Sequence, residues 1–310
     1  MTSGALAPAI VVALYSDSTG LRSRPILERL LRAAAPGDLA VALHTSPDDG
    51  DARLVAMARE LGLRLWWGLP YDGVARALRQ SGGAVARALA ATWARHVHQI
   101  APDVEVVCLD GEALWRADAA ADVATLGALA LDVIEATRVG CPNARVSWTS
   151  FDHPLWHRLP WGAILGPGGV DMHAPQIYAA PEQGVADLAA ARRRFEAQDE
   201  QWRVLADRHP AIRRELLTGC AGWTPYVQAH HVALAGTVEL MDRADTARVW
   251  AIPSRCDDAG VIAVESLLRM RRAVGRSRGT VRRYQAMRGL VPDGICGPRT
   301  LALLDAEARG

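Results

Sequence analysis

The sequence predicts a (β/α)8 barrel followed by a small helical module at the C-terminus. Three observations support this fold class: strand-like apolar runs alternate with helical segments, eight such runs are present, and no nucleotide-binding glycine motif follows any of them. Regular alternation of strands and helices is typical of parallel α/β folds, and eight repeats suit a closed barrel. A doubly wound open sheet is the alternative, but its usual signatures, G-x-G-x-x-G or a P-loop, are missing.

The expected elements follow one another along the chain. Strands are expected at 9–14, 38–43, 63–67, 104–109, 145–148, 170–178, 215–220 and 247–252. Helices are expected at 23–36, 51–61, 73–100, 118–139, 182–208, 225–244 and 259–274. Their limits rest on helix-starting and helix-ending residues: Pro25 lies in the first turn after Ser23, and Gly62 and Gly140 directly follow two helices. The connection 151–169 is expected to be a loop with at most one short helix.

Length and composition permit one large domain and one small one. The chain has 310 residues, 50% of them hydrophobic, and a net charge of +1, which gives no bulk electrostatic argument for nucleic acid or an anionic membrane. We assign residues 1–274 to the barrel and 275–310 to the module, complete or partial. No apolar stretch is long enough to span a bilayer, and the N-terminus lacks a classical export signal, so we expect synthesis in the cytoplasm. The five cysteines are scattered and are expected to be reduced.

Two acidic residues follow the fourth predicted strand. Asp110 and Glu112 are two positions apart, so on an extended chain both carboxylates point to the same side, with Cβ atoms roughly 6.5–7 Å apart. Such proximity separates the pKa values of two carboxyl groups, which suits glycoside hydrolysis by a proton donor and a charge-stabilising partner. In a barrel the C-terminal strand ends carry the chemistry. The structural alternative is that both residues cap the following turn.

The sequence Leu109-Asp110-x-Glu112 after an apolar strand resembles the fourth barrel strand of chitinases and barrel-type muramidases. The resemblance implies that Glu112 is the general acid and that Asp110 orients the substrate N-acetyl group or stabilises charge. It also supports Asp17, which follows the first strand, as a site residue; an Asx turn is the alternative. The further aspartates of the chitinase motif are replaced here by Glu105 and Cys108.

Aromatic and amide side chains at other strand ends are candidates for sugar binding. The chain has ten tryptophans and two phenylalanines, and indole rings stack on the flat faces of sugars. The same tryptophans are equally compatible with a role in the core. The substrate-binding candidates are Trp67, Trp148, Trp223, Trp250, Gln176 and Tyr178.

The C-terminal segment carries a specific pattern. Tyr284-Gln285 lies on a short predicted helix that ends at Gly289, followed by the turn Asp293-Gly294, then Gly297-Pro298 and Thr300 at the start of another helix. This pattern resembles the peptidoglycan-binding repeat of cell-wall hydrolases, which implies a wall-binding module formed by Tyr284, Gln285, Asp293, Gly294, Gly297 and Thr300. Residues 262–270 are a candidate for its first helix. The alternative is a helical extension that packs on the barrel.

Other chemistries have weaker support. His153 and His157 have helical spacing, but Pro154 lies between them, and no Gly-x-Ser-x-Gly elbow is present. We therefore expect no metal and no cofactor.

Together these features predict a peptidoglycan-directed glycoside hydrolase, similar to a muramidase, that cleaves glycan strands by acid/base catalysis. Its expected partners are peptidoglycan strands and proteins of a phage or phage-tail-like particle, with no nucleic acid and no membrane. It is expected to act at the bacterial wall as an endolysin or after particle delivery. The alternative is a catalytically silent wall-binding or structural subunit of such a particle, and a third option is an amidase or peptidase acting on the stem peptide.

Overall fold

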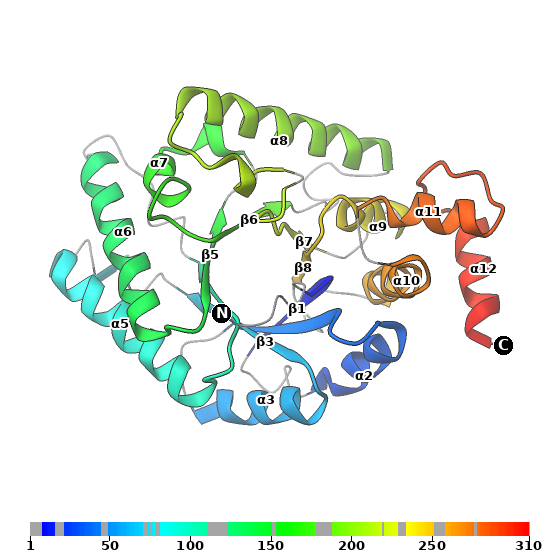
Figure 1. Cartoon of the computed structure of the whole chain (residues 1–310), viewed down its shortest axis with the longest axis horizontal. Helices are drawn as coiled ribbons and strands as arrows, with labels where there is room; N and C mark the ends of the chain where they lie inside the picture. Colours follow the sequence, from blue (N-terminus) through cyan, green and yellow to red (C-terminus); the bar gives the residue numbers. More distant parts are fainter. Residues whose placement is uncertain are drawn as a thin grey trace.

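The structure is a computed structural model that describes residues 8–15, 22–44, 49–70, 74, 76–77, 81–110, 123–150, 153–177, 188–218, 220–228, 234–250, 258–275 and 278–309. Within these residues, eight parallel strands close into a barrel in sequence order, and the last strand pairs with the first (Figure 1). The strands are β1 (Ile10–Tyr15), β2 (Leu39–His44), β3 (Arg64–Pro70), β4 (Val106–Asp110), β5 (Arg145–Ser150), β6 (Met172–Ile177), β7 (Tyr226–Gln228) and β8 (Ala247–Trp250). The predicted fold class is confirmed.

Helices surround the barrel on its outside (Figure 1). They are α2 (Arg24–Ala33), α3 (Asp49–Glu60), α5 (Gly83–Ile100), α6 (Val123–Gly140), α7 (Trp161–Ile164), α8 (Leu188–Arg208), α9 (Leu234–Asp242) and α10 (Asp258–Val274). The connection after β5 holds a short 3-10 helix, η1 (Pro154–Trp156), and α7. None of the helices in the described ranges has both the length and the apolar character needed to cross a membrane.

The seventh strand differs from the sequence prediction. The segment predicted as a strand at 215–220 instead contains a 3-10 helix, η3 (Arg214–Leu216), and the strand forms later, at β7. The Pro225 carbonyl accepts the Arg248 backbone N–H at 2.8 Å, which aligns the residues after Pro225 with β8. The helix predicted from Pro225 therefore begins only at α9.

The strands bury side chains on both faces. A small cluster of strand residues lies inside the barrel: Val11, Ala40, Ala42, Trp66, Val106 and Met172. The intervening strand residues belong to the larger core, which they share with the surrounding helices. This division follows from the two-residue repeat of a strand, in which neighbouring side chains point to opposite faces.

A buried arginine occupies the barrel interior. Arg248 is fully buried; its Nη2 donates to Ser147 Oγ at 2.6 Å and its Nε to Thr224 Oγ1 at 3.2 Å. Its guanidinium carbon lies 4.7 Å from the ring centroid of Trp66, a cation–π contact. The interior is thus filled by side chains, as expected for a barrel of eight strands.

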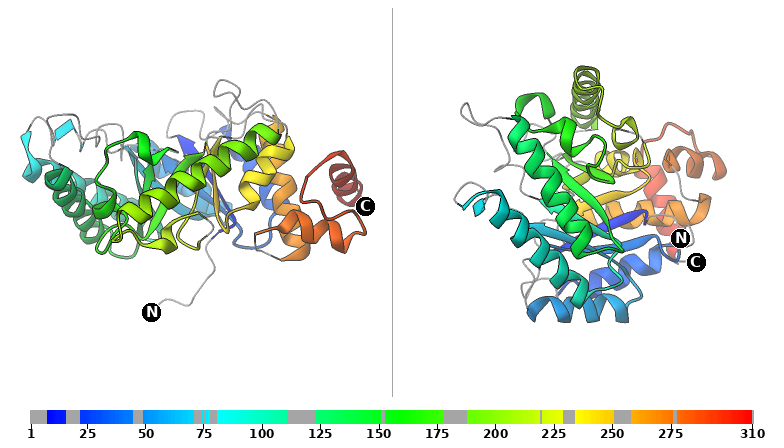
Figure 2. Two further views of the ribbon diagram at one scale, coloured as in Figure 1. Left: turned by 90° about the horizontal axis from the view of Figure 1, so that it is seen from above. Right: turned by 60° about the vertical axis from the view of Figure 1, so that its left-hand side comes forward.

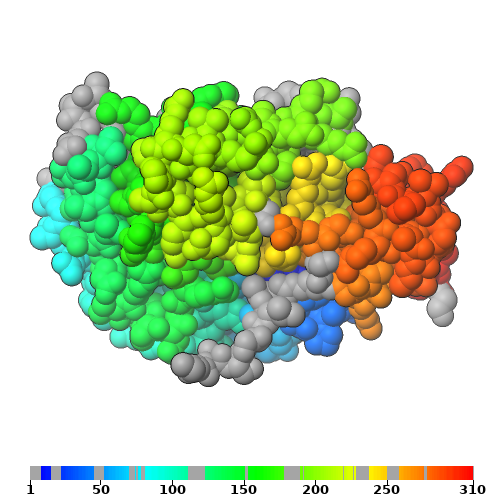
Figure 3. All heavy atoms as spheres, turned by 45° about the horizontal axis from the view of Figure 1, so that its top comes forward, coloured from blue at the N-terminus to red at the C-terminus, as the bar shows by residue number. Residues whose placement is uncertain are grey.

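Two further helices, α11 (Thr280–Met287) and α12 (Pro298–Arg309), form the C-terminal module at one edge of the barrel (Figures 2 and 3). Val281, Tyr284, Cys296 and Leu304 are buried and belong to the main core. The Asp242 carboxylate at the end of α9 accepts the backbone N–H groups of Thr280 and Val281, at 2.9 and 3.1 Å. This side chain, remote in sequence, caps the first turn of α11 and attaches the module to the barrel.

Candidate active site

Asp110 is the last residue of β4 and is half-buried. Cys108, two residues earlier, has its Sγ 2.9 Å from Thr149 Oγ1 of β5, so side chains of this parity face the barrel interior. Asp110 therefore lies on the interior side at the C-terminal end of its strand, where barrel enzymes carry their active sites. Glu112, Asp17 and Tyr178 lie outside the described residues, so their predicted roles stay predictions.

Gln176 of β6 occupies a related position. Gln176 and the interior residue Met172 are separated by an even number of positions on the strand, so both side chains are on the interior side. Gln176 is half-buried. Gln176 pairs in register with Tyr226 of β7. Asp110 and Gln176 thus place an acid and an amide on the interior side near the C-terminal ends of two strands.

A neutral imidazole lies at the end of β2. His44 is the last residue of that strand and is buried, and burial, with a smaller effect of the Arg248 charge, lowers its pKa to about 3. Its ring occupies space left by Gly68 on β3, because a Cβ atom at Gly68 would lie 2.3 Å from two ring atoms of His44. Neither His44 nor Gly68 was predicted as a site residue from the sequence. His44 could have been predicted from β2, because it follows the interior residues Ala40 and Ala42 at alternate positions of the strand.

Three of the tryptophans predicted to bind sugar are core residues. Trp67, Trp148 and Trp223 are at most 1% exposed and pack in the layer between the strands and the helices. A sugar in the barrel mouth cannot reach that layer, so this part of the prediction is wrong. The cause is strand parity, since Trp67 points outward while its neighbour Trp66 points inward. Trp250 ends β8 and pairs in register with Gln228; its side chain lies outside the description.

The predicted wall-binding residues form a hydrogen-bond network within the module. The Gln285 side-chain amide donates to Asp293 Oδ1 at 2.8 Å and to the Ile295 carbonyl at 2.9 Å, and its oxygen accepts the Gly294 N–H at 2.9 Å. It also donates to Thr300 Oγ1 at 3.2 Å. The motif residues at these positions therefore hold the loop between α11 and α12.

Tyr284 and Gly297 also have structural roles. Tyr284 is fully buried, and its hydroxyl group donates to Glu307 at 2.8 Å; burial and Glu307 raise its pKa to about 12. The Gly297 N–H donates to the Ile295 carbonyl at 2.8 Å. An open groove of about 670 Å³ runs beside this loop, lined by Leu290, Val291, Pro298 and Arg299 among others. Wall binding at the module stays a prediction.

One histidine of the pair considered for a metal has other partners. His153 stacks on Trp156, with ring centroids 4.0 Å apart, and its Nδ1 lies 2.9 Å from Gln201 Nε2. Within the described ranges, no group of three or more His, Cys, Asp or Glu side chains has a metal-binding arrangement.

The fold defines this chain as a (β/α)8 barrel protein with the architecture found in glycoside hydrolases. It is similar to the β-galactosidase from the psychrophilic Marinomonas ef1, with a TM-score of 0.57 and 8% identity over 92% of this chain and 61% of that one. A GH5_18 protein from Streptomyces cattleya, solved with Manb1-4GlcNAc, has a TM-score of 0.56 and 14% identity over 86% of this chain and 81% of that one.

The present chain thus spans about three fifths of the length of the β-galactosidase. No protein-family model matches it, and no curated protein matches its sequence. At these identities the likeness establishes the fold, and the chemistry has to be argued from the site.

Proposed function

We propose that the protein is a glycoside hydrolase that cleaves the glycan strands of peptidoglycan, with Glu112 as general acid and base and Asp110 as its assisting carboxylate. The observation that supports this most directly is the position of Asp110, half-buried on the interior side at the C-terminal end of β4. Glu112 is two residues further along, so an extended chain would place it on the same side.

The proposed chemistry uses the substrate's own acetamido group. Glu112 donates a proton to the glycosidic oxygen as the bond to the anomeric carbon breaks, and the acetamido oxygen bonds to that carbon in its place. Asp110 orients the acetamido group and stabilises its positive charge; Gln176 and Tyr178 are proposed to hold it. Water, deprotonated by Glu112, then opens the cyclic intermediate and restores the acetamido group. Substrate-assisted hydrolysis of this kind is an established exception to the two-carboxylate scheme.

The proposed substrate rests on the C-terminal module. Its sequence resembles the peptidoglycan-binding repeat, and the motif residues form a compact loop with a groove beside it. We propose the bacterial wall as the place of action, reached as an endolysin or with a phage-tail-like particle.

The test is the release of fragments from purified peptidoglycan by wild type, Asp110→Asn and Glu112→Gln. A general acid contributes about 10²- to 10⁴-fold to the rate, so Glu112→Gln should reduce the release of reducing ends by at least a hundredfold. Glu135→Gln is a matched control, because Glu135 is exposed on α6. New amino groups without reducing ends would instead indicate an amidase or peptidase. Full activity of Glu112→Gln would refute the assignment.

A silent wall-binding subunit is the second candidate. It is favoured by the burial of Trp67, Trp148 and Trp223, which leaves fewer aromatic side chains for a sugar platform. In that case wild type and Glu112→Gln would both sediment with peptidoglycan, and neither would release fragments.

A further inference from the structure

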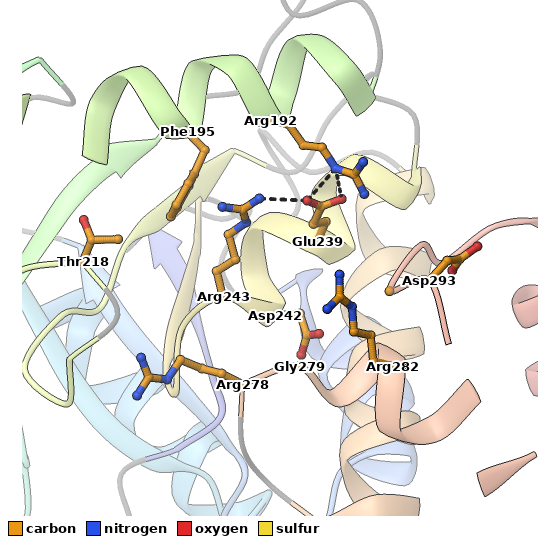
Figure 4. Close-up of a pocket in the computed structure, with 11 residues that line it drawn as sticks. Arg192, Phe195, Thr218, Glu239, Asp242, Arg243, Arg278, Gly279, Arg282 and Asp293 are labelled. Atoms are coloured by element: carbon orange, nitrogen blue, oxygen red, sulfur yellow. Dashed lines mark hydrogen bonds and ion pairs between the residues drawn. The ribbon is translucent and has the colours of Figure 1, made fainter. Parts of the chain in front are cut away.

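A cleft of about 410 Å³ lies where the C-terminal module meets the barrel (Figure 4). Its walls come from α8, α9, the connection before α11, α11 itself and the Asp293-Gly294 turn. Pockets that bind small molecules start at roughly 300 Å³. The cleft is therefore large enough for a charged group together with the atoms that carry it.

Four arginines line this cleft: Arg192, Arg243, Arg278 and Arg282. Three carboxylates also line it, but two of them are engaged by N–H donors. Asp242 accepts two backbone N–H groups of α11, and Asp293 accepts from Ile295 N and Gln285, with its carboxylate turned away from the other side chains in Figure 4.

The third carboxylate, Glu239, is shared by two arginines. Arg192 Nε lies 2.9 and 3.0 Å from its two oxygens, and Arg243 Nη2 lies 3.0 Å from one of them. The Arg243 guanidinium also lies over the Phe195 ring, 4.2 Å from its centroid. The Glu239 carboxylate thus directly faces two guanidinium groups, and the cleft lining as a whole holds four arginines against three carboxylates.

Arg282 adds a cation with free donors. It is exposed, and in the described part of the chain it has no ion pair or hydrogen bond. Figure 4 shows its guanidinium directed towards the Glu239–Arg192 pair. Arg278 also lines the cleft, but it pairs at 3.5 Å with Asp245, a carboxylate that is not part of the cleft lining.

The turn glycine leaves room for the Arg282 side chain. A Cβ atom at Gly294 would lie 2.9 Å from Arg282 Nε and 3.0 Å from its Cγ, and Gly294 has a φ of +79°. The glycine of the Asp-Gly turn therefore allows both the turn and the close approach of this arginine.

We propose that this cleft is a binding site for an oxyanion-bearing ligand, a carboxylate or a phosphate ester, with Arg282 as its principal contact and Arg192 and Arg243 as supporting contacts. Guanidinium groups present several N–H donors in a plane that matches carboxylate and phosphate oxygens. The ligand would enter beside Glu239 and compete with it for the arginines. This site is separate from Asp110 and Glu112 and does not depend on glycan hydrolysis.

The test is calorimetric titration of the full-length chain with citrate, pyrophosphate and, as a neutral probe, N-acetylglucosamine. Arg282→Gln should weaken binding of the anions about tenfold or more, since charged hydrogen bonds of this kind have effects of that size. Arg203→Gln, at an exposed position of the same α8 that carries Arg192, removes an equal charge and should leave binding unchanged. Preference for citrate or for pyrophosphate would identify the source as carboxylate or phosphate.

Glu239→Gln gives a prediction of the opposite sign. Removing the competing carboxylate should strengthen anion binding, provided that thermal unfolding confirms a folded chain. A network that serves only to attach the module would bind none of the probes. The proposal is overturned if wild type binds neither anion, or if Arg282→Gln binds them as wild type does.

Discussion

The side-chain amide of Gln285 donates a hydrogen bond to a carboxylate oxygen of Asp293, 2.8 Å away. Both residues belong to the segment that resembles a wall-binding repeat, and their bond shapes the loop from which such a repeat is built. Substitutions here should therefore act first on stability and only then on binding.

We expect Gln285→Ala to destabilise the protein by about 2–4 kcal/mol, because four hydrogen bonds of the buried amide are lost and their partners remain. Urea unfolding, with digestion of the C-terminal segment as a local probe, measures the effect. Arg299→Ala alters an exposed residue of the same module and should change stability by less than about 0.5 kcal/mol. Equal effects of the two substitutions would contradict the structural role of Gln285.

The order of strands and helices was largely predictable, because most elements are long and end at clear helix-terminating residues. Gly62 and Gly140, for example, stand at the ends of α3 and α6 in the structure as in the prediction. The seventh strand was not predictable in this way. It has three residues, and its position depends on pairing of Pro225 with Arg248, a contact between distant parts of the chain.

The candidate site was harder to predict than the fold. Strands of a parallel barrel are apolar on both faces, so hydrophobicity does not tell which neighbour points inward. Trp66 and Trp67 illustrate this: the first contacts Arg248 inside the barrel and the second packs outside. The position of Asp110 was accessible, since it directly follows an apolar strand. The fit of His44 against Gly68 joins two strands, so the alternation within β2 places His44 on the interior side but does not reveal Gly68 as its partner.

That fit gives a second prediction. Gly68→Ala should destabilise the protein by about 1–3 kcal/mol, because the new methyl group would overlap the His44 ring in a closed interior. Adding His44→Ala should recover part of the loss, which a double-mutant cycle in urea measures. Gly162→Ala is the control, because a Cβ atom there has no neighbour within 4 Å. Additive effects of Gly68→Ala and His44→Ala would show that the two sites do not interact.

A third prediction concerns pH. His173 is fully buried; Nδ1 lies 3.2 Å from the Leu216 carbonyl and so donates to it, which leaves Nε2 to accept from the Ser150 hydroxyl at 2.6 Å. Burial lowers its pKa from 6.5 to about 3, opposed in part by the Leu216 bond. Between these values the unfolded chain binds a proton that the folded chain does not, so stability is fully present above about pH 6.5 and falls as the pH decreases.

Below pH 6.5, His173 is expected to lower the free energy of unfolding by about 1.4 kcal/mol for each unit by which the pH falls. This is its contribution to the slope of stability against pH. Urea unfolding at pH 7.5, 6.5, 5.5 and 4.5 measures the slope. His173→Gln should lower stability at every pH but reduce the slope, because glutamine does not titrate. His209→Gln, at an exposed position after α8, is the control for replacing a histidine by glutamine as such. A His173→Gln slope equal to that of wild type would show that this imidazole does not titrate on unfolding.

The last prediction concerns the attachment of the C-terminal module. Asp242 of α9 accepts the first two backbone N–H groups of α11, so Asp242→Ala removes a cap and leaves two buried donors without their partner. We expect a loss of about 1–2 kcal/mol, confined largely to α11 and α12.

Hydrogen exchange should become faster at the amides of 280–287, while the amides of β1 to β4 keep their protection. Asp245→Ala is the matched control, because Asp245 is a half-exposed carboxylate that pairs with Arg278 at 3.5 Å and caps none of the helices in the described residues. Faster exchange throughout the barrel in Asp242→Ala would show that module and barrel unfold as one unit, and the module would then have to be treated as part of the barrel core.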